Sequence, residues 1–300
     1  MGSILDNLPI HPEGMLSLAF RRWQIQNRFF RRFGTYVDFE NPKTIQEKIQ
    51  YRKLYGNQPV YALLADKYLV RQFVQERVGG DILIPLLGVY DHLTPSAFDP
   101  LPDKFIIKAN HGCKWHQIVR DKSSLDVKST CRRFNQFLRQ NYAKASGEYH
   151  YTLIKPRIVI ETLLDDQGDS PVDYNFFCHH SPEGFEYSLS VSTPRLERQV
   201  HFAQHGDGYE GTCTLEEVET LRHPKNFDRM LSIAESLSRG FDFMRIDLYN
   251  LDGAIYFGEA TSTPASGLRA IDNPARAALR SRQWKLDRHN PLLYRPRKAA

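Results

Sequence analysis

The later part of the chain alternates apolar and polar residues on either side of a turn, which predicts a β-hairpin. The segment "RIDLYNLDGAIYFGEATSTP" covers residues 245–264, with the turn at "NLDG". Asp247 and Glu259 stand in arms that otherwise have the pattern of buried strands. Burying a carboxylate is costly unless a cation or hydrogen-bond donors compensate it. The hairpin is therefore the first candidate for a functional site.

The geometry of the turn decides whether the two acids share a face of the hairpin. A type I turn followed by a glycine bulge, with Gly253 at positive φ, puts Asp247 and Glu259 on one face as diagonal neighbours, roughly 7–8 Å apart. A tight two-residue turn at Asp252-Gly253 would reverse the parity and separate them. We expect the first arrangement, with Arg245 on the same side. The alternative is a solvent-facing hairpin in which Arg245 pairs with Glu259.

Periodic segments elsewhere predict a mixture of helices and short strands. A capping box of Thr44 and Glu47 opens one helix. Further helices are expected over residues 20–33, 60–80, 124–143 and 223–241. Strands are expected over residues 82–90, 104–110, 117–121, 155–164, 173–180 and 184–192, and residues 194–211 have the pattern of a loop. This order of elements predicts an α+β protein.

Composition narrows the class of protein. The chain has 300 residues, 41% of them hydrophobic, but its apolar runs fall short of the ~18 residues that a membrane-spanning helix needs. The first residues lack the features of a secretory signal, so we expect a cytoplasmic protein. The four cysteines stand far apart, which argues against structural zinc and a disulfide framework.

The net charge of +5 includes two basic segments, residues 20–33 and 276–298. The first could bring the protein into peripheral contact with the inner membrane face. A solvated helix face is the alternative. We expect no nucleic-acid partner.

Lys108 is a candidate phosphate ligand, because it ends an apolar strand where a lysine is costly unless it meets an anion. The loop that follows contains Gly112, whose backbone could cover phosphates. A lysine whose charged end simply reaches solvent is the alternative. The sequence contains neither a P-loop motif nor a dinucleotide-binding glycine motif after a strand.

Several motifs occur together in one order: "NPKTIQEKIQ", "LADKYLVRQFV", "IPLLGVYD", "LPDKFIIKANHG", "IVRDKS", "DYNFFC" and the hairpin segment. Over about residues 40–270 the chain resembles the TupA-like ATP-grasp family. The resemblance implies an ATP-grasp fold, in which two α+β lobes clasp ATP after an N-terminal helical, pre-ATP-grasp region. We expect these parts at residues 1–102 (N-terminal region), 103–162 (small lobe, or lid) and 163–300 (large lobe with the hairpin and the basic tail).

The resemblance also implies an activity. ATP-grasp enzymes use ATP and Mg²⁺ to activate a carboxylate as an acyl phosphate, which an amine then attacks. We expect a ligase of this kind that couples a small carboxylic acid to an amine, with an amino acid or a sugar acid as substrate, in surface-polysaccharide or specialised-metabolite synthesis. One alternative is a glycosyltransferase of polysaccharide synthesis. Another is a non-enzymatic protein that binds anionic surfaces.

Roles for individual residues follow from the matching motifs. Arg245 and Lys108 would stabilise phosphate during catalysis, and Asp247, Glu259 and Thr261 would hold magnesium. The nucleotide would contact Lys67, Lys108, the loop of Asn110, His111 and Gly112, the hinge of Glu161, Thr162, Leu163 and Leu164, and Asp165 or Asp166 at the ribose. The chain departs from the family at Asn175, where lysine is common, and at Thr261, where many ATP-grasp proteins have asparagine.

Substrate recognition rests on residue chemistry alone. A guanidinium can bind a carboxylate through two parallel hydrogen bonds. The candidates are Arg195, Arg198 and Arg269, with a single contact from His201. Exposed surface residues without a binding role are the alternative for each.

Overall fold

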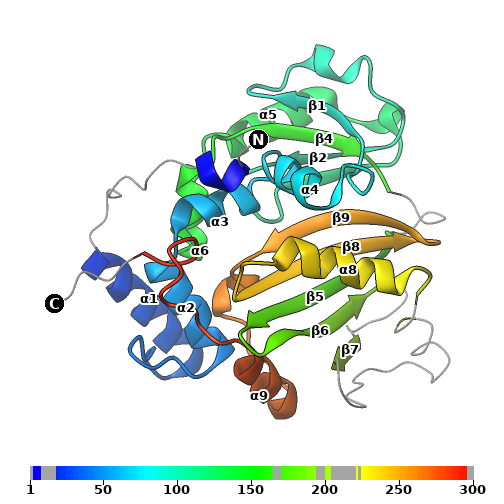
Figure 1. Cartoon of the computed structure of the whole chain (residues 1–300). Coiled ribbons are helices and arrows are strands. Elements are labelled where there is room, and N and C mark those ends of the chain that lie inside the picture. The colour runs from blue at the N-terminus through cyan, green and yellow to red at the C-terminus, as the bar shows by residue number, and fades with distance from the viewer. Residues whose placement is uncertain are drawn as a thin grey trace.

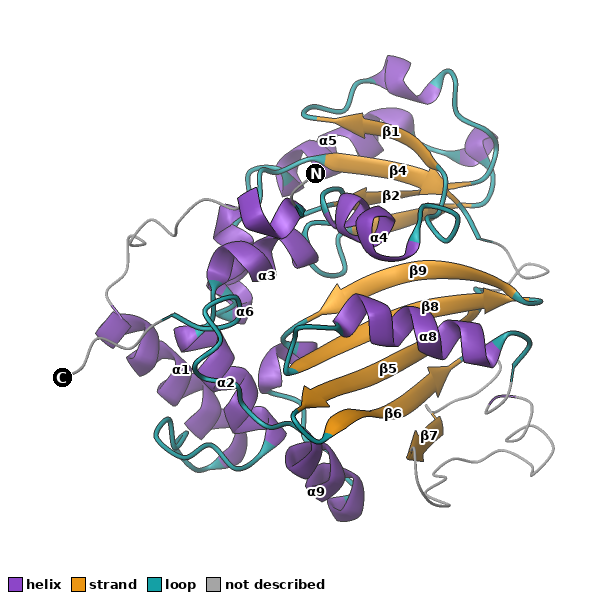
Figure 2. Ribbon diagram, in the orientation of Figure 1, coloured by secondary structure: helices purple, strands orange, loops and turns teal. Residues whose placement is uncertain are grey.

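The computed structural model describes residues 3–7, 18–164, 170–193, 200–203, 221 and 224–295. Two antiparallel sheets, each covered by helices, form two lobes that lie one above the other in Figure 1. Helices near the N-terminus lie beside both lobes (Figure 2). The predicted α+β class is confirmed.

The N-terminal part is helical. It comprises η1 (Ile4–Asn7), α1 (Leu18–Phe33), α2 (Ile45–Tyr55), α3 (Gln58–Ala65) and α4 (Val70–Val78). The capping box is present, because Thr44 accepts a hydrogen bond from the backbone of Glu47 and Glu47 bonds back to Thr44. The single helix expected over residues 60–80 is wrong: α3 and α4 are separate. Asp66 causes the break, because its carboxylate accepts from the backbone N–H groups of Tyr68 (2.9 Å) and Leu69 (3.3 Å).

The small lobe is built on a four-stranded sheet in the order β1-β4-β2-β3. Its strands are β1 (Leu86–Tyr90), β2 (Phe105–Ala109), β3 (His116–Val119) and β4 (Ile158–Thr162). α5 (Val127–Phe137) covers one face, where Phe105, Ile107 and Phe134 are fully buried. The 3₁₀ turns η2 (Pro95–Phe98) and η3 (Lys122–Ser124) complete the lobe.

Pairing with β4 places β1 in the small sheet. The expected division at residue 102 had left residues 86–90 in the N-terminal region. The helix expected over residues 124–143 is likewise divided. α5 ends at Phe137, and Asn141 then caps a new helix, α6 (Tyr142–Ser146), which is followed by η4 (Tyr149–Leu153).

The large lobe is built on a five-stranded sheet in the order β7-β6-β5-β8-β9. Its strands are β5 (Val172–Ser181), β6 (Gly184–Ser192), β7 (Val200–Ala203), β8 (Phe243–Leu251) and β9 (Ala254–Thr261). α8 (Phe227–Ser238) covers one face (Figure 1), where Phe176, Cys178 and Ile246 are fully buried. β7 lies within the segment that we expected to be loop.

A buried arginine anchors the open end of the β8–β9 hairpin. Arg52 of α2 donates to the carbonyl oxygens of Phe243 (2.8 Å) and Ser262 (3.0 Å), and it forms an ion pair with Asp242. Its guanidinium also stacks on Trp284, which follows α9 (Pro274–Gln283). Because these bonds hold both strand ends, they restrict the relative position of the two acidic arms.

Candidate functional site

The two acids of the hairpin lie directly opposite each other, although the turn is not the one that we expected. Leu251 pairs with Ala254, so Asp252 and Gly253 form a tight two-residue turn with both φ angles positive. That turn alone would put Glu259 on the opposite face from Asp247. An irregularity next to Asp247 inserts one extra residue, Gly258, and restores the parity.

The bulge leaves little room for a side chain. A Cβ at Gly258 would lie 3.1 Å from the carbonyl oxygen of Asp247. Asp247 and Glu259 then form a cross-strand pair, with Cα atoms about 4.5–5.5 Å apart. The prediction that they share a face is correct, and they are closer than the expected diagonal arrangement.

Arg245 joins the two acids into one cluster. Its guanidinium donates to both carboxylate oxygens of Asp247 (2.7 and 2.6 Å), to Glu259, and to the hydroxyl of Thr261 (3.3 Å). Thr261 in turn donates to Glu259 at 2.5 Å. The proposed metal ligands and the proposed catalytic arginine therefore meet at one point on the face opposite α8.

A third acid, Asp173 on β5, belongs to the same cluster, and our sequence analysis missed it. Asp173 accepts a hydrogen bond from Asn175, whose Cα lies opposite that of Asp247. Burial raises the pKa of Asp173 to about 6. Its position two residues before Asn175 in "DYNFF" was the available signal, because alternate residues of a strand share a face.

Acidic side chains outnumber the arginine at this point. Burial raises the pKa of Asp247 well above its usual value; Arg245 opposes this effect, and Glu259 and Asp173 strengthen it. The Glu259 side chain is still 49% exposed, and its partial desolvation is outweighed by Arg245, Thr261 and Lys67, which together bring its pKa below the usual value. Three carboxylates share one guanidinium, an arrangement that an additional cation would stabilise.

The small lobe contributes a second cluster, of opposite sign, centred on Lys108. The Lys108 ammonium lies 2.6 Å from one oxygen of Glu161, and Arg71 lies 3.0 Å from the other. Burial raises the pKa of Tyr249 in the large lobe. The negative charges of Asp173, Asp247 and Glu161 raise it further. Tyr249 is thus within electrostatic reach of both Glu161 and the acidic cluster.

Lys67 lies between the two clusters. Its ammonium donates to the carbonyl oxygen of Gly112 at 2.6 Å. Burial lowers its pKa, Glu259 acts in the opposite direction, and Lys108 adds to the lowering. Lys67, Lys108 and Glu259, far apart in the sequence, are therefore neighbours in space.

The loop after Lys108 is held from within. Asn110 is fully buried, and its amide donates to Asp66 (2.9 Å) and to the carbonyl of Lys155 (3.0 Å). His111 is also buried, with one ring nitrogen 3.0 Å from the carbonyl oxygen of Phe137. These side chains support the loop, so contacts with phosphate would come from the backbone around Gly112.

The expected adenine hinge, Glu161 to Leu164, begins in the last two residues of β4 and continues past its end. The backbone N–H of Thr162 donates to the carbonyl of Pro85 at 3.0 Å, and Leu163 and Leu164 are half-buried. Asp165 and Asp166 lie outside the described residues. On the sheet face that carries Lys108 and Glu161, Ile118 is 40% exposed. An exposed apolar side chain beside a lysine could contact a purine base, and sequence reasoning missed it.

A strained turn follows the acidic strand. Ala265 and Ser266 in η5 (Pro264–Gly267) have positive φ angles of 48° and 56°. Buried Lys53 holds this turn through the hydroxyl of Ser266 (2.8 Å). Strain of this kind persists only where surrounding contacts enforce it, and it is often found at functional sites. The sequence carried no signal for it.

The three substrate arginines have different outcomes. Arg195 and Arg198 lie outside the described residues. Arg269 is exposed and lowers the pKa of His201 together with Arg276 and Arg280, although burial of His201 is the larger cause.

Magnesium suits the acidic cluster. Within the described ranges, no group of three or more His, Cys, Asp and Glu side chains is arranged to enclose a metal ion by itself. Magnesium, however, commonly binds one or two carboxylates and completes its octahedron with water and substrate phosphates. Asp247 and Glu259 provide such a pair.

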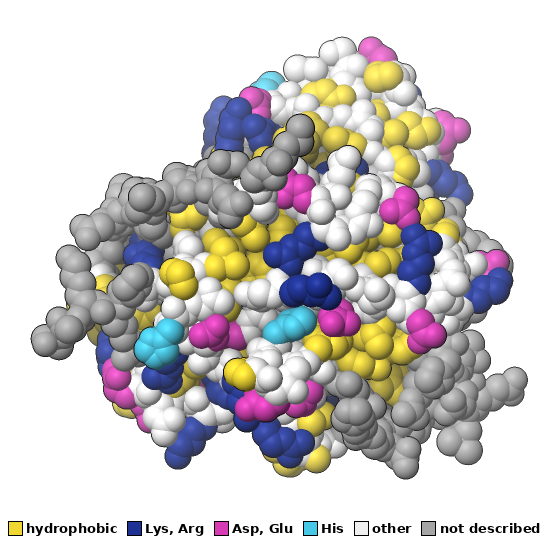
Figure 3. Space-filling view, viewed as in Figure 1, with side chains coloured by type: hydrophobic (Ala, Val, Ile, Leu, Met, Phe, Trp, Pro, Cys, Tyr) yellow, Lys and Arg dark blue, Asp and Glu magenta, His cyan; other side chains and the backbone are white. Residues whose placement is uncertain are grey.

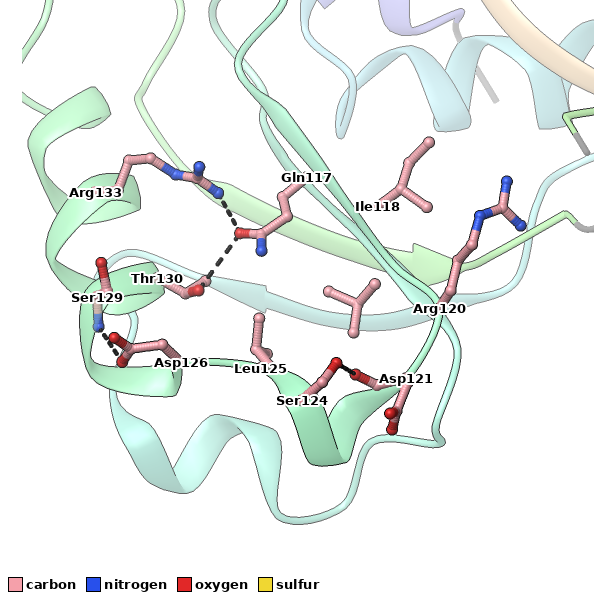
Figure 4. A pocket seen from close by; sticks show the side chains of 11 residues that line it. Gln117, Ile118, Arg120, Asp121, Ser124, Leu125, Asp126, Ser129, Thr130 and Arg133 are labelled. Atoms are coloured by element: carbon pink, nitrogen blue, oxygen red, sulfur yellow. Dashed lines mark hydrogen bonds between the residues drawn. The ribbon is translucent and has the colours of Figure 1, made fainter. Parts of the chain in front are cut away.

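A pocket of about 270 Å³ lies elsewhere on the small lobe, between β3, η3 and α5 (Figure 4). Gln117, Thr130 and Arg133 line it, and both Thr130 and Arg133 donate hydrogen bonds to the amide oxygen of Gln117. It contains none of the predicted site residues.

The basic helix α1 uses arginines for internal contacts. Arg21 stacks on Tyr149, Arg28 donates to the carbonyl of Lys144 (2.7 Å), and Arg32 donates to that of Leu268 (2.9 Å). Acidic and basic side chains are interspersed on the face that carries α8 (Figure 3). Every helix in the described part of the chain is too short or too polar to span a bilayer.

Solved structures with a similar arrangement include D-alanine–D-alanine ligases. The one from Helicobacter pylori has 15% identity and a TM-score of 0.44 over 74% of this chain and 59% of that chain. The ATP complex from Bacillus anthracis has 12% identity and a TM-score of 0.38 over 83% of this chain and 78% of that one. N5-carboxyaminoimidazole ribonucleotide synthetase from Thermus thermophilus has 11% identity and a TM-score of 0.35 over 72% of this chain and 52% of that one.

These likenesses are too distant to support an argument about function, and the chain spans only about three-fifths of the length of the Helicobacter pylori structure, 59%. No curated protein matches the chain. The sequence model described as "TupA-like ATPgrasp" matches residues 47–275, more than half of the chain. The resemblance drawn from the motifs is thereby confirmed: the chain belongs to the TupA-like ATP-grasp family.

Proposed function

We propose that the protein is an ATP- and Mg²⁺-dependent ligase that activates a carboxylic acid as an acyl phosphate and joins it to an amine. One observation carries this proposal: Asp247, Glu259 and Arg245 form one cluster in the large lobe, and Glu259 is within electrostatic reach of Lys67, which is itself close to Lys108 of the small lobe. Membership of an ATP-grasp family supports the general form, an ATP-dependent ligase.

The small lobe, together with Lys67 of the N-terminal region, would bind the nucleotide. Lys108 and Lys67 supply positive charge for phosphate oxygens, and Ile118 supplies apolar surface for the base. In this structure Lys108 is paired with Glu161. Because Arg71 also pairs with Glu161, Lys108 can turn to a phosphate without leaving that carboxylate unpaired.

The large lobe would position the reacting groups. An oxygen of the acid substrate attacks the γ-phosphorus of ATP, and the bond to ADP breaks. The amine then attacks the acyl carbon, forming the amide and releasing phosphate and a proton. Arg245 is placed to stabilise the negative charge of the transferring phosphoryl group, since catalysis of this transfer depends mainly on positioning and electrostatics.

Asp247, Glu259 and Thr261 would hold the magnesium ion, which when bound would neutralise charge on the phosphate oxygens. Arg245 now occupies the space between the two carboxylates. A cation held by these carboxylates would replace the guanidinium, which would then be available to the phosphates. This rearrangement keeps the acids compensated in both states.

The finer assignments are also proposals. An acid and an amine from surface-polysaccharide or specialised-metabolite synthesis would be the substrates, and the use of ATP favours the cytoplasm as the setting. Asn175 stands next to Asp173. The positive charge that a lysine would bring there is supplied, in this proposal, by Lys67 and Arg245.

A direct test is a screen of carboxylic acids and amines for ADP release, with hydroxylamine included to capture acyl phosphates. We expect ADP release that requires ATP, Mg²⁺ and one acid, together with thermal stabilisation by MgATP. Stabilisation by UDP-sugars alone, without ADP release from any acid, would instead indicate the glycosyltransferase.

A further inference from the structure

A row of polar residues crosses the whole large sheet on the face opposite α8. Successive strand partners are His201, Ser190, Asn175, Asp247 and Glu259, one from each of the five strands. Since neighbouring strands lie about 4.8 Å apart, Ser190 is about 10 Å from Asp247. One end of the row is the acidic cluster; the other end is chemically different.

That other end is built around Arg280 of α9. Arg280 is only 6% exposed, and its guanidinium donates to the hydroxyls of Ser190 (2.8 Å) and Ser188 (3.4 Å). It also stacks on the ring of Phe177, 3.5 Å from the centroid. Packing and hydrogen bonds therefore hold a guanidinium in one orientation against the sheet.

Positive charge accumulates at this end. His201 shares a hydrogen bond with Ser190 (2.7 Å), so it lies in the same group as Arg280. Burial, followed by the charges of Arg276, Arg280 and Arg269, lowers the pKa of His201 to about 3. The imidazole is therefore neutral at physiological pH and can donate a hydrogen bond without adding charge.

The two ends are suited to different parts of one ligand. The strand partners of Phe177 are Arg245, in the acidic cluster, and Ser188, to which Arg280 donates. Phe177 therefore stands between the acidic cluster and the serines that hold Arg280. A short molecule with its reacting carboxylate near Arg245 could place a second group near Arg280, about two strands away. A fixed guanidinium with neighbouring hydroxyl and imidazole groups would bind an anion there.

We propose that Arg280, Ser190 and His201 bind a second anionic group of the acid substrate, so that the proposed ligase acts on acids with two anionic groups. This inference rests on the proposed function, because it assumes that the carboxylate to be activated lies at the Asp247–Glu259 end. The second group is a carboxylate or a phosphate; both present oxygens that a guanidinium can bind.

Binding of matched small acids tests the inference. Glutarate and its monoamide, glutaramate, differ by one charge, and O-phosphoserine and serine differ by the phosphate. We expect glutarate, O-phosphoserine or both to raise the melting temperature of the protein when AMP-PNP and Mg²⁺ are present. The acid that does so should bind at least tenfold more tightly than its matched compound, glutaramate or serine, which lacks the second anionic group. A response to only one of the two identifies the second group as carboxylate or phosphate.

Variants then assign the effect to Arg280. Arg280→Gln should weaken binding of the responding acid at least tenfold, and Ser190→Ala should weaken it less. Arg282→Gln is the matched control, because Arg282 is an exposed arginine on the same helix. Each shift is measured from that variant's own melting temperature, and Ser190→Ala serves as the test if Arg280→Gln does not fold.

The possible failures are distinguishable. Equal binding of the charged and uncharged members of both pairs, or binding unchanged in Arg280→Gln and Ser190→Ala, would overturn the inference even if MgATP still binds. A wild-type protein that does not bind MgATP would instead overturn the proposed function.

Discussion

Glu259→Gln is the sharpest perturbation of the proposed metal site, because it removes one charge and keeps the shape of the side chain. Three carboxylates (Asp173, Asp247 and Glu259) now share Arg245. A unit charge about 4 Å from another contributes about 4 kcal/mol near a protein surface. The amide oxygen of the introduced glutamine can still contact the ion and offsets part of the lost interaction energy. The net loss is about 3 kcal/mol, which corresponds to about a 100-fold loss of Mg²⁺-dependent nucleotide affinity.

The fold should tolerate this change. The Glu259 side chain is 49% exposed, so its ion pair with Arg245 contributes less than about 1 kcal/mol to stability after solvent screening. Arg245 keeps both hydrogen bonds to Asp247.

Titration calorimetry with AMP-PNP, with and without Mg²⁺, measures the effect. Asp252→Asn is the matched control, because it removes the same charge from the same hairpin. Asp252 lies at the turn, far from the acidic cluster. A Glu259→Gln protein that is folded and has the wild-type gain in affinity from Mg²⁺ would refute the metal assignment.

Three further outcomes are expected. Lys108→Gln should weaken nucleotide binding at least tenfold by calorimetry while the melting temperature changes little, because Arg71 still pairs with Glu161; unchanged affinity would contradict the phosphate role. Thr44→Ala should lower the free energy of unfolding in urea by about 1 kcal/mol, with nucleotide affinity unchanged, because it removes the cap of α2. Asp173→Asn should stabilise the protein at pH 7, since a carboxyl whose folded pKa is raised to about 6 costs stability as the pH rises from about 4 through 6. Urea unfolding from pH 4 to pH 7 should show this advantage shrinking toward pH 4, and an advantage that grows toward pH 4 would contradict the assignment.

Local interactions made part of the fold predictable. The capping box at Thr44 and Glu47 and the alternation in the hairpin arms depend on residues a few positions apart, so the sequence carries them directly. The single helix expected over residues 60–80 failed for a related reason. Asp66 is also bonded to Asn110, 44 positions away, and this partner is not visible from the helical pattern.

The acidic pair shows where local reasoning ends. The sequence by itself determined that two carboxylates and an arginine occur in one hairpin, and it identified the family through the order of its motifs. Only the tertiary structure decided that the acids meet: the tight turn at Gly253 would have separated them, and the bulge at Gly258 reverses this. Because side chains alternate with a period of two residues, a single inserted residue changes the face of every residue after it.

The remaining parts of the site depend on contacts between distant segments. Asp173 of β5 and Arg280 of α9 lie on one face of the large sheet, and Lys67 of the N-terminal region comes close to Glu259. Neither the hydrophobic pattern nor the charge of these segments determines which strands become neighbours. The sequence therefore determined which chemical groups are present, and the packing of the two sheets and the N-terminal helices decided which of them act together.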